Sequence, residues 1–421
     1  MVLGALAGAA IGAACRTSEP IAPPERALTD IAERYVRVAL KLAQHQPDLV
    51  DAYLGPAEWR PGPRVPVAGL LAETIQLSAA IDALGRDRTP EALRTRLRYL
   101  AGQVKGLRTA ARRLAGESMR FADEARDALG IEWSARPSAA AEDARRDLDA
   151  RLPGTGSLHE RYTAFRRRHA VARDAVLPVF EAAIAMCRER VRERVTLPDE
   201  ERVDADVLDG GGFEARAIYS GAFRTRVAID PSGTADLARI VWLAAHEAYP
   251  GHHLQHVLAE RECVRGKGWI ERTLHPGFGP HMLMAEGAAE AGAALLLEGD
   301  DFLSLCASLA ADAKTTLVAI PDLIAVQRRI TSLDDAVAIV ADAYLDGGMG
   351  TAAAVDQLRE EVLVPDASQL LGAIERQRTR ILAYPVGRRL VIDQMAAMAA
   401  VERWPALQAI ATQLVLKPSG D

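Results

Sequence analysis

Apolar side chains recur at the three- and four-residue spacing of amphipathic helices along most of this 421-residue chain. In residues 28–46, for example, Ile31, Tyr35, Val38 and Leu42 fall on one helical face. Ala and Leu, which favour helix over strand, dominate many such segments. The pattern predicts a mostly α fold, with helices expected at residues 28–46, 67–84, 90–114, 139–152 and 157–195 and again over much of 280–404.

One stretch departs from the helical pattern. Residues 213–230 (FEARAIYSGAFRTRVAID) alternate in polarity and follow three glycines, which predicts a short β-hairpin turning at Ser220 and Gly221. Ser232 and Thr234 are then candidate N-caps for a helix that runs into residues 245–256. We therefore expect a small strand element immediately before a cluster of histidines.

Composition and charge narrow the class of protein. Hydrophobic residues make up 49% and charged residues 26%, with a net charge of −6, which is typical of a folded globular chain. Lys and Arg form no long run and are not interleaved with aromatic residues, so we expect no nucleic-acid partner. No linker divides residues 23–421, which we expect to form a single mostly helical domain; the pattern gives no indication of an oligomeric state.

The N-terminal segment resembles an export signal. Residues 1–14 are entirely apolar or glycine, too short to span a bilayer, and are followed by Cys15 and a Pro-rich polar spacer. Small residues ending in cysteine resemble a bacterial lipoprotein box, in which the cysteine is lipidated. We expect residues 1–22 to be a signal- or lipoprotein-like segment with its spacer, and the protein to be exported to the periplasm or anchored to the membrane through Cys15. If residues 1–14 are instead a frayed tail, the protein is cytoplasmic.

The stretch AHEAYPGHHLQH, residues 245–256, begins like the zinc-binding motif H-E-x-x-H. His246 is followed by Glu247, but Pro250 stands where the second histidine is expected, and the next histidines are His252 and His253. Proline opposes a regular helix. A bend there would bring His252 near His246, whereas a helix ending at residue 249 would leave only a cluster of polar histidines.

A third ligand is expected downstream, in the helical segment HMLMAEGAAEAGAALLLEGD. Glu286 and Glu290 are four residues apart and therefore lie on one helical face. Their neighbours are mostly apolar or small, so solvated acids are the weaker alternative, because burying two carboxylates without a cation is costly. The spacing suits one metal ligand and one carboxylate that orients a ligating histidine.

These residues resemble the bacterial family called domain of unknown function 885. The matching segments are HEAYPGHH at 246–253 and EGAAEAG at 286–292, with further likeness in YLGPAEW at 53–59, SMRFADEARDALGI at 118–131 and AYPVGRRLV at 383–391. The family is regarded as zincin-like, similar in helical architecture to carboxypeptidase Taq, thimet oligopeptidase and angiotensin-converting enzyme. The resemblance implies a zincin-like catalytic domain over residues 23–421.

The resemblance also implies residue roles. His246, His252 and Glu286 would be the metal ligands, Glu247 the general base, and Glu290 a residue that contacts a ligand. His253 would be an alternative ligand or an orienting partner. Zn²⁺ is the expected ion, although a similar divalent ion fits the same donors.

Three further residues are candidates for the substrate site. Tyr384, in a Tyr-x-x-Gly turn that the family shares, would stabilise an oxyanion as a catalytic residue. Arg388 would bind a substrate carboxylate through its planar guanidinium, and Tyr219 of the hairpin would face the substrate cleft. Packing of the two tyrosines and solvation of Arg388 are the alternatives.

The sequence thus favours a zinc-dependent metallopeptidase that hydrolyses peptide bonds, with a peptide or small amide as substrate. The alternatives are a zinc lyase or a non-peptide amidohydrolase on the same scaffold, and a non-catalytic binding lipoprotein that holds a structural metal.

Overall fold

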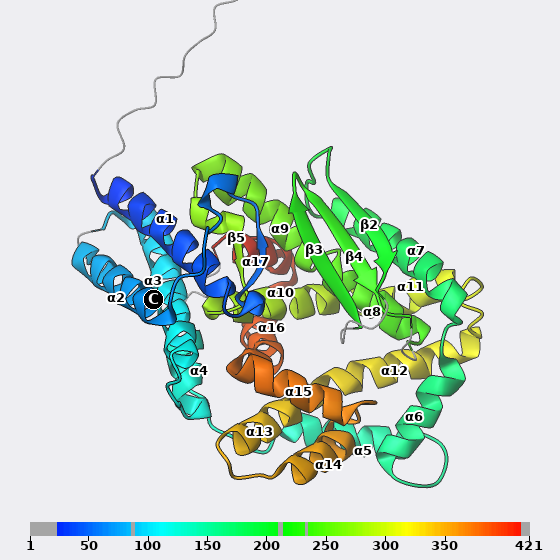
Figure 1. Cartoon of the computed structure of the whole chain (residues 1–421). Coiled ribbons are helices and arrows are strands. Elements are labelled where there is room, and N and C mark those ends of the chain that lie inside the picture. The colour runs from blue at the N-terminus through cyan, green and yellow to red at the C-terminus, as the bar shows by residue number, and fades with distance from the viewer. Residues whose placement is uncertain (1–22, 86–88, 209–213, 232–234, 414–421) are drawn as a thin grey trace, which may run out of the picture.

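Helices dominate the computed structural model, which confirms the expected mostly α fold (Figure 1). The structure describes residues 23–85, 89–208, 214–231 and 235–413, so the expectations for residues 1–22, including Cys15, and for Ser232 and Thr234 lie outside it. The longer helices of the described residues are α1 Pro23–Ala43, α2 Val67–Leu84, α3 Glu91–Leu114, α4 Phe121–Leu129, α5 Ala139–Arg151, α6 Leu158–His169, α7 Arg173–Arg192, α8 Leu237–Glu247, α9 His252–Ala259, α10 Pro280–Leu296, α11 Asp301–Leu309, α12 Ile320–Ile330, α13 Asp334–Leu345, α14 Thr351–Val362, α15 Ala367–Gln377, α16 Arg388–Ala396 and α17 Ala400–Gln413.

Helix α2 occupies residues 67–84, the range expected from the sequence. Within the described part of the chain, it is the one helix long and apolar enough to cross a membrane, with a mean hydropathy of 1.4. It packs against both α1 and α3, burying Leu70, Leu77 and Ile81. The apolar composition of α2 is therefore also explained by its packing against α1 and α3.

The stretch of residues 157–195 is helical as expected, but it forms two helices, α6 and α7, with a break between them. Ser157 and Glu160 form a capping box at the start of α6. In the break, the backbone N–H of Val171 donates to the carbonyl of Ala235, 3.0 Å away, and the Val171 side chain is buried. A tertiary hydrogen bond and apolar burial thus replace the helical bond that the local pattern predicts.

The expected hairpin is present and belongs to a three-stranded sheet. Strands β3 (Ala215–Gly221) and β4 (Arg224–Ile229) pair antiparallel, and β2 (Arg202–Val207) pairs parallel with β4 on its other side. The turn is at Ala222 and Phe223, both with positive φ, rather than at Ser220 and Gly221. A second, two-stranded sheet joins β1 (Val50–Tyr53) to β5 (Leu274–Pro276). Strand β3 is an edge strand of its sheet.

Helices α8 and α10 form the centre of the molecule (Figure 1). Every residue of α8 except Arg239 is buried, and α8 contacts α7, α10, α11 and α12. Its N-cap is Asp236, whose side chain accepts the Arg239 backbone N–H at 3.1 Å. Because α8 is enclosed on so many sides, its C-terminal residues are held in fixed positions.

A short π-helix, η8 (Ala383–Gly387), lies directly on α10. A Cβ added at Gly287 would lie 2.2 Å from the carbonyl oxygen of Gly387, so the two backbones approach as only glycine permits. This contact brings the segment that carries Tyr384 to the part of α10 that carries Glu286.

Candidate metal centre

The histidine motif is divided between two helices. Helix α8 ends at Glu247, the Tyr249–Pro250 peptide bond is cis, and α9 begins at His252. At Gly251 an added Cβ would lie 1.6 Å from the carbonyl oxygen of His246, so the chain folds back on α8 more closely than any side chain allows. The segment is therefore bent, and the alternative of a solvated histidine cluster does not describe it, since His246 and His253 are buried and His252 is mostly buried.

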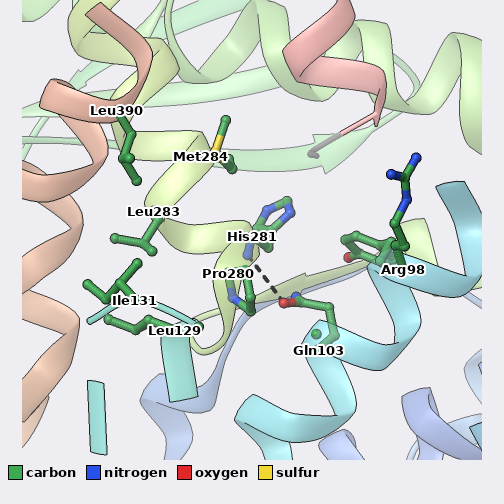
Figure 2. A pocket seen from close by; sticks show the side chains of 12 residues that line it. Arg98, Gln103, Leu129, Ile131, Pro280, His281, Leu283, Met284 and Leu390 are labelled. Carbon is green, nitrogen blue, oxygen red and sulfur yellow. Dashed lines mark hydrogen bonds between the residues drawn. The ribbon is translucent and has the colours of Figure 1, made fainter. Parts of the chain in front are cut away.

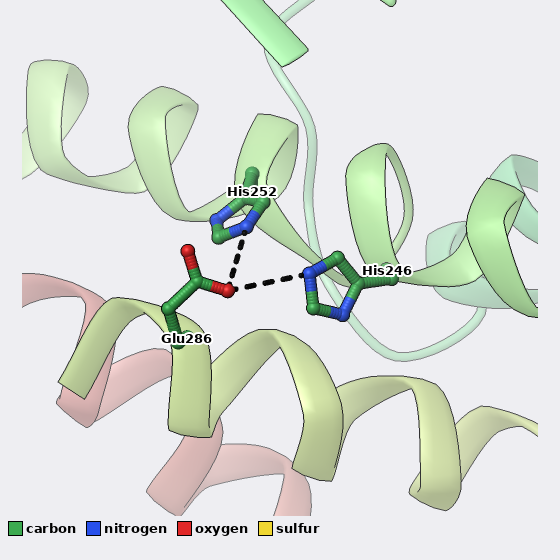
Figure 3. Close-up of side chains that lie close together, drawn as sticks. All are labelled: His246, His252 and Glu286. Carbon is green, nitrogen blue, oxygen red and sulfur yellow. Dashed lines mark ion pairs between the residues drawn. The ribbon is translucent and has the colours of Figure 1, made fainter. Parts of the chain in front are cut away.

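The bend brings together His246, His252 and Glu286 (Figure 3). The Nε2 atoms of both histidines lie 3.5 Å from Oε2 of Glu286, and one ligand atom from each residue lies within 4.8 Å of the others. Figure 3 shows the carboxylate of Glu286 rising from α10 toward the two rings. Three residues that span 40 positions of the sequence, from His246 to Glu286, thus form one compact donor set.

Glu290 lies on the other side of the His246 ring, with its Oε1 atom 3.0 Å from Nδ1. Burial alone would lower the pKa of His246, but Glu286 and Glu290 outweigh it and raise that pKa well above its usual value. Burial would likewise lower the pKa of His252, yet the charge of Glu286 raises it. The two carboxylates therefore favour positive charge at this position, and Glu290 is placed to orient His246.

The donor set fits a divalent metal ion. Ligand atoms about 2.0–2.1 Å from a tetrahedral ion are roughly 3.4 Å from one another, close to the 3.5 Å that separates each histidine Nε2 atom from Oε2 of Glu286. Oε2 of Glu286 is buried without a hydrogen-bond partner, although it faces both histidines. Two imidazoles and one carboxylate are also a donor set of catalytic zinc sites, which keep a fourth position open.

Glu247 follows His246 at the end of α8 and is buried. Its Oε2 atom accepts the backbone N–H of Ala217, 2.8 Å away on the edge strand β3. Sequence reasoning missed this amide, since a backbone group carries no residue signal. The hydrogen bond fixes the carboxylate next to the ligand set and ties the strand to the site.

Tyr384 is the most open of the candidate catalytic side chains, with 36% of its surface exposed. The charge of Glu286, with burial and the charge of Glu247, raises the pKa of its phenol well above the usual value. The raised pKa favours the protonated phenol, which can donate a hydrogen bond.

Tyr219 and Arg388 contact other groups of the chain. The Tyr219 hydroxyl donates to Glu260 at 2.5 Å, and its buried ring stacks on His256 and His275. The Arg388 guanidinium donates to the carbonyl of Thr331 and lies 3.9 Å from Asp335. Both side chains are therefore engaged in contacts within the fold.

His253 points away from the donor set. Its Nδ1 atom lies 2.6 Å from the Thr225 hydroxyl and its Nε2 atom 2.8 Å from Glu201, and the residue is fully buried. Both ring nitrogens are therefore occupied by the protein. Of the two roles expected for His253, the geometry accommodates the orienting one. Glu201 is the last of three consecutive acidic residues before β2, and nothing in the sequence distinguished it from the other two.

A separate cavity of about 320 Å³ lies between α3, the start of α10 and α16 (Figure 2). His281 and Met284 line it from α10, and Gln103 of α3 accepts the backbone N–H of His281 at 3.2 Å. None of the three candidate ligands lines this cavity, so it is distinct from the candidate metal site.

Comparison with known proteins gives a likeness of fold. No family model and no curated protein matches the chain. Among solved structures, a "putative lipoprotein" from Colwellia psychrerythraea matches with a TM-score of 0.51 and 16% identity, covering 86% of this chain and 69% of that one. A "putative lipoprotein of unknown function" from Shewanella oneidensis gives a TM-score of 0.47 and 14% identity, covering 83% and 73%. At these identities, the first likeness shows a shared fold alone.

Proposed function

We propose that this protein is a zinc-dependent peptidase. The observation that carries the proposal is the convergence of His246, His252 and Glu286 with Glu247 beside them. A purely structural metal site has no need of a carboxylate held next to its ligands, whereas a metal-assisted hydrolase does. The resemblance of the HEAYPGHH and EGAAEAG segments to the zincin-like family supports the same reading, and we infer membership of that family.

The chain's own residues supply the remaining chemistry. A bound zinc ion would act as a Lewis acid that makes a water molecule nucleophilic near neutral pH. Glu247 accepts the proton of the attacking water and passes it to the leaving amine. Tyr384 donates its phenolic hydrogen to the oxygen that becomes negative on the substrate carbonyl. Glu290 keeps the His246 ring oriented.

A peptide is the substrate that best fits the surroundings. Ala217, which binds Glu247, belongs to the edge strand β3, and a sheet edge can pair with an extended backbone. A substrate held along β3 would present its carbonyl groups close to Glu247. Small amides offer no backbone for such pairing, so they rank second.

We further propose that the protein is exported and anchored through lipidated Cys15. The lipobox-like sequence around Cys15 supports this, as does the name of the Colwellia psychrerythraea structure with the similar fold. Cys15→Ser should abolish incorporation of labelled fatty acid and move the protein from the membrane fraction to the soluble one. A wild-type protein that takes up no label would contradict the anchor.

The proposed function predicts metal-dependent peptide hydrolysis. The purified protein should bind about one zinc ion per chain and cleave members of a mixed peptide library; a chelator should remove both properties and added zinc restore them. Cleavage confined to small amides or esters would favour the amidohydrolase alternative. One tightly bound ion without turnover of any substrate would favour the binding lipoprotein.

A further inference from the structure

A buried carboxylate outside the metal centre connects the two sides of the bend. Glu201 lies between α7 and β2, and its side chain is completely buried. Its Oε1 atom accepts the hydroxyl of Tyr249 and lies 2.8 Å from Nε2 of His253. Its Oε2 atom accepts two hydrogen bonds from Arg188, at 3.0 and 2.9 Å. Both oxygens of this carboxylate are therefore engaged.

The two partners on Oε1 occupy defined places in the bend. Tyr249 directly precedes Pro250, and His253 directly follows the candidate ligand His252. The second nitrogen of His253 is held by Thr225 of β4. Consecutive helical side chains are about 100° apart, so fixing the His253 ring also fixes the direction in which His252 leaves α9. Glu201 thus links the residue at the end of the bend's first side, Tyr249, to the first turn of α9, where His253 is also held by Thr225.

The bend needs such a restraint. Proline and glycine at positions 250 and 251 interrupt the regular helical hydrogen bonds between α8 and α9. Wider backbone bonds cross the bend instead, from Gly251 N–H to the Ala245 carbonyl at 3.0 Å and from Leu254 N–H to the Ala248 carbonyl at 3.3 Å, but they do not fix where the side chains of α9 point. His246 is fixed by the enclosed helix α8 and Glu286 by α10, whereas His252 stands at the first position of the short helix α9. Its placement depends on contacts beyond the local chain.

We propose that Glu201 is a positioning residue that holds the bend through Tyr249 and His253, and so sets the affinity of the His246–His252–Glu286 site for its ion. The inference rests on the proposed function, because it requires that the site binds metal. Glu201 contacts no ligand; it acts through the side chains on either side of the bend.

The test compares two buried glutamates. Glu201→Gln should weaken Zn²⁺ binding, measured by competition with a chelator, by about 10-fold, the lower end of the loss seen when a group bonded directly to a ligand is removed, because Glu201 acts one contact further out. Glu271→Gln is the matched control, because Glu271 is equally buried and makes a similar two-pronged contact with Arg96, at 2.7 and 2.9 Å, away from the bend. The control should lower Tm but leave zinc affinity unchanged. The visible spectrum of the Co²⁺-loaded protein should change in the Glu201 variant alone.

Each outcome bears on the inference. Wild-type zinc affinity in Glu201→Gln would overturn it, as would equal weakening in both variants, which would indicate general destabilisation. If Glu201→Gln does not fold, Tyr249→Phe removes one of the hydrogen bonds and should still weaken zinc binding several-fold; an unchanged affinity would then count against the inference. A wild-type chain that binds no zinc would instead remove the proposed function.

Discussion

Replacing Glu247 by Gln should leave zinc binding intact and lower the rate of peptide hydrolysis by about 10²–10⁴-fold, the usual contribution of a general acid–base group. Gln keeps the size of the side chain and an oxygen that can accept the Ala217 N–H, but it cannot take a proton from water. Because Glu247 is not in the donor set, the ion should remain. Turnover and metal content measured on the same preparation check both parts.

One matched control and one further variant make the result specific. Glu271→Gln carries the same chemical change at a buried site away from the cluster and should keep its turnover per bound zinc. Tyr384→Phe should also keep the ion and lose about 10²–10³-fold in turnover, as removal of an oxyanion donor does. Full activity in Glu247→Gln would end its assignment as the base, and loss of the ion would make it a determinant of binding instead.

The second large effect is expected at His252. His252→Ala removes one of three donors and should reduce zinc in the purified protein from about one ion per chain to nearly none. The loss in affinity should exceed the roughly 10–100-fold that is typical of an outer partner. Elemental analysis and chelator competition measure the two quantities.

His253→Ala provides the neighbouring comparison, since it removes the same ring one position later. It should unfold at a lower temperature, because Glu201 and Thr225 lose their buried partner, yet reach one ion per chain at saturating zinc. The opposite pattern, with the ion lost from His253→Ala and kept by His252→Ala, would transfer the ligand role to His253.

Local sequence patterns were sufficient to predict those elements whose structure depends on residues close together in the sequence. The apolar spacing of residues 67–84 and 139–152 predicted α2 and α5 almost to the residue, and alternation predicted the β3–β4 hairpin. The parallel partner β2 was missed, because its sequence RVDADV is short and polar and its pairing with β4 is made across a crossover. Strands β1 and β5 were also missed. They pair with each other although they lie more than 200 residues apart in the sequence, so no local pattern indicates the pairing.

The sequence by itself determined which residues could form the site. Imidazole and carboxylate are metal donors whatever the fold, and a proline followed by glycine interrupts a helix. Residue type and spacing therefore indicated His246, Glu247, one of the pair His252 and His253, and the pair Glu286 and Glu290, while the family resemblance implied His252 and Glu286. Only the tertiary structure decided whether His252 or His253 lies beside Glu286, because the choice depends on how α9 is rotated about its axis. The contacts of His253 with Glu201 and Thr225, together with the enclosed position of α8, hold that rotation. Those contacts join segments distant in sequence. A rotation of α9 by one residue, about 100°, would place His253 instead of the candidate ligand His252 beside Glu286.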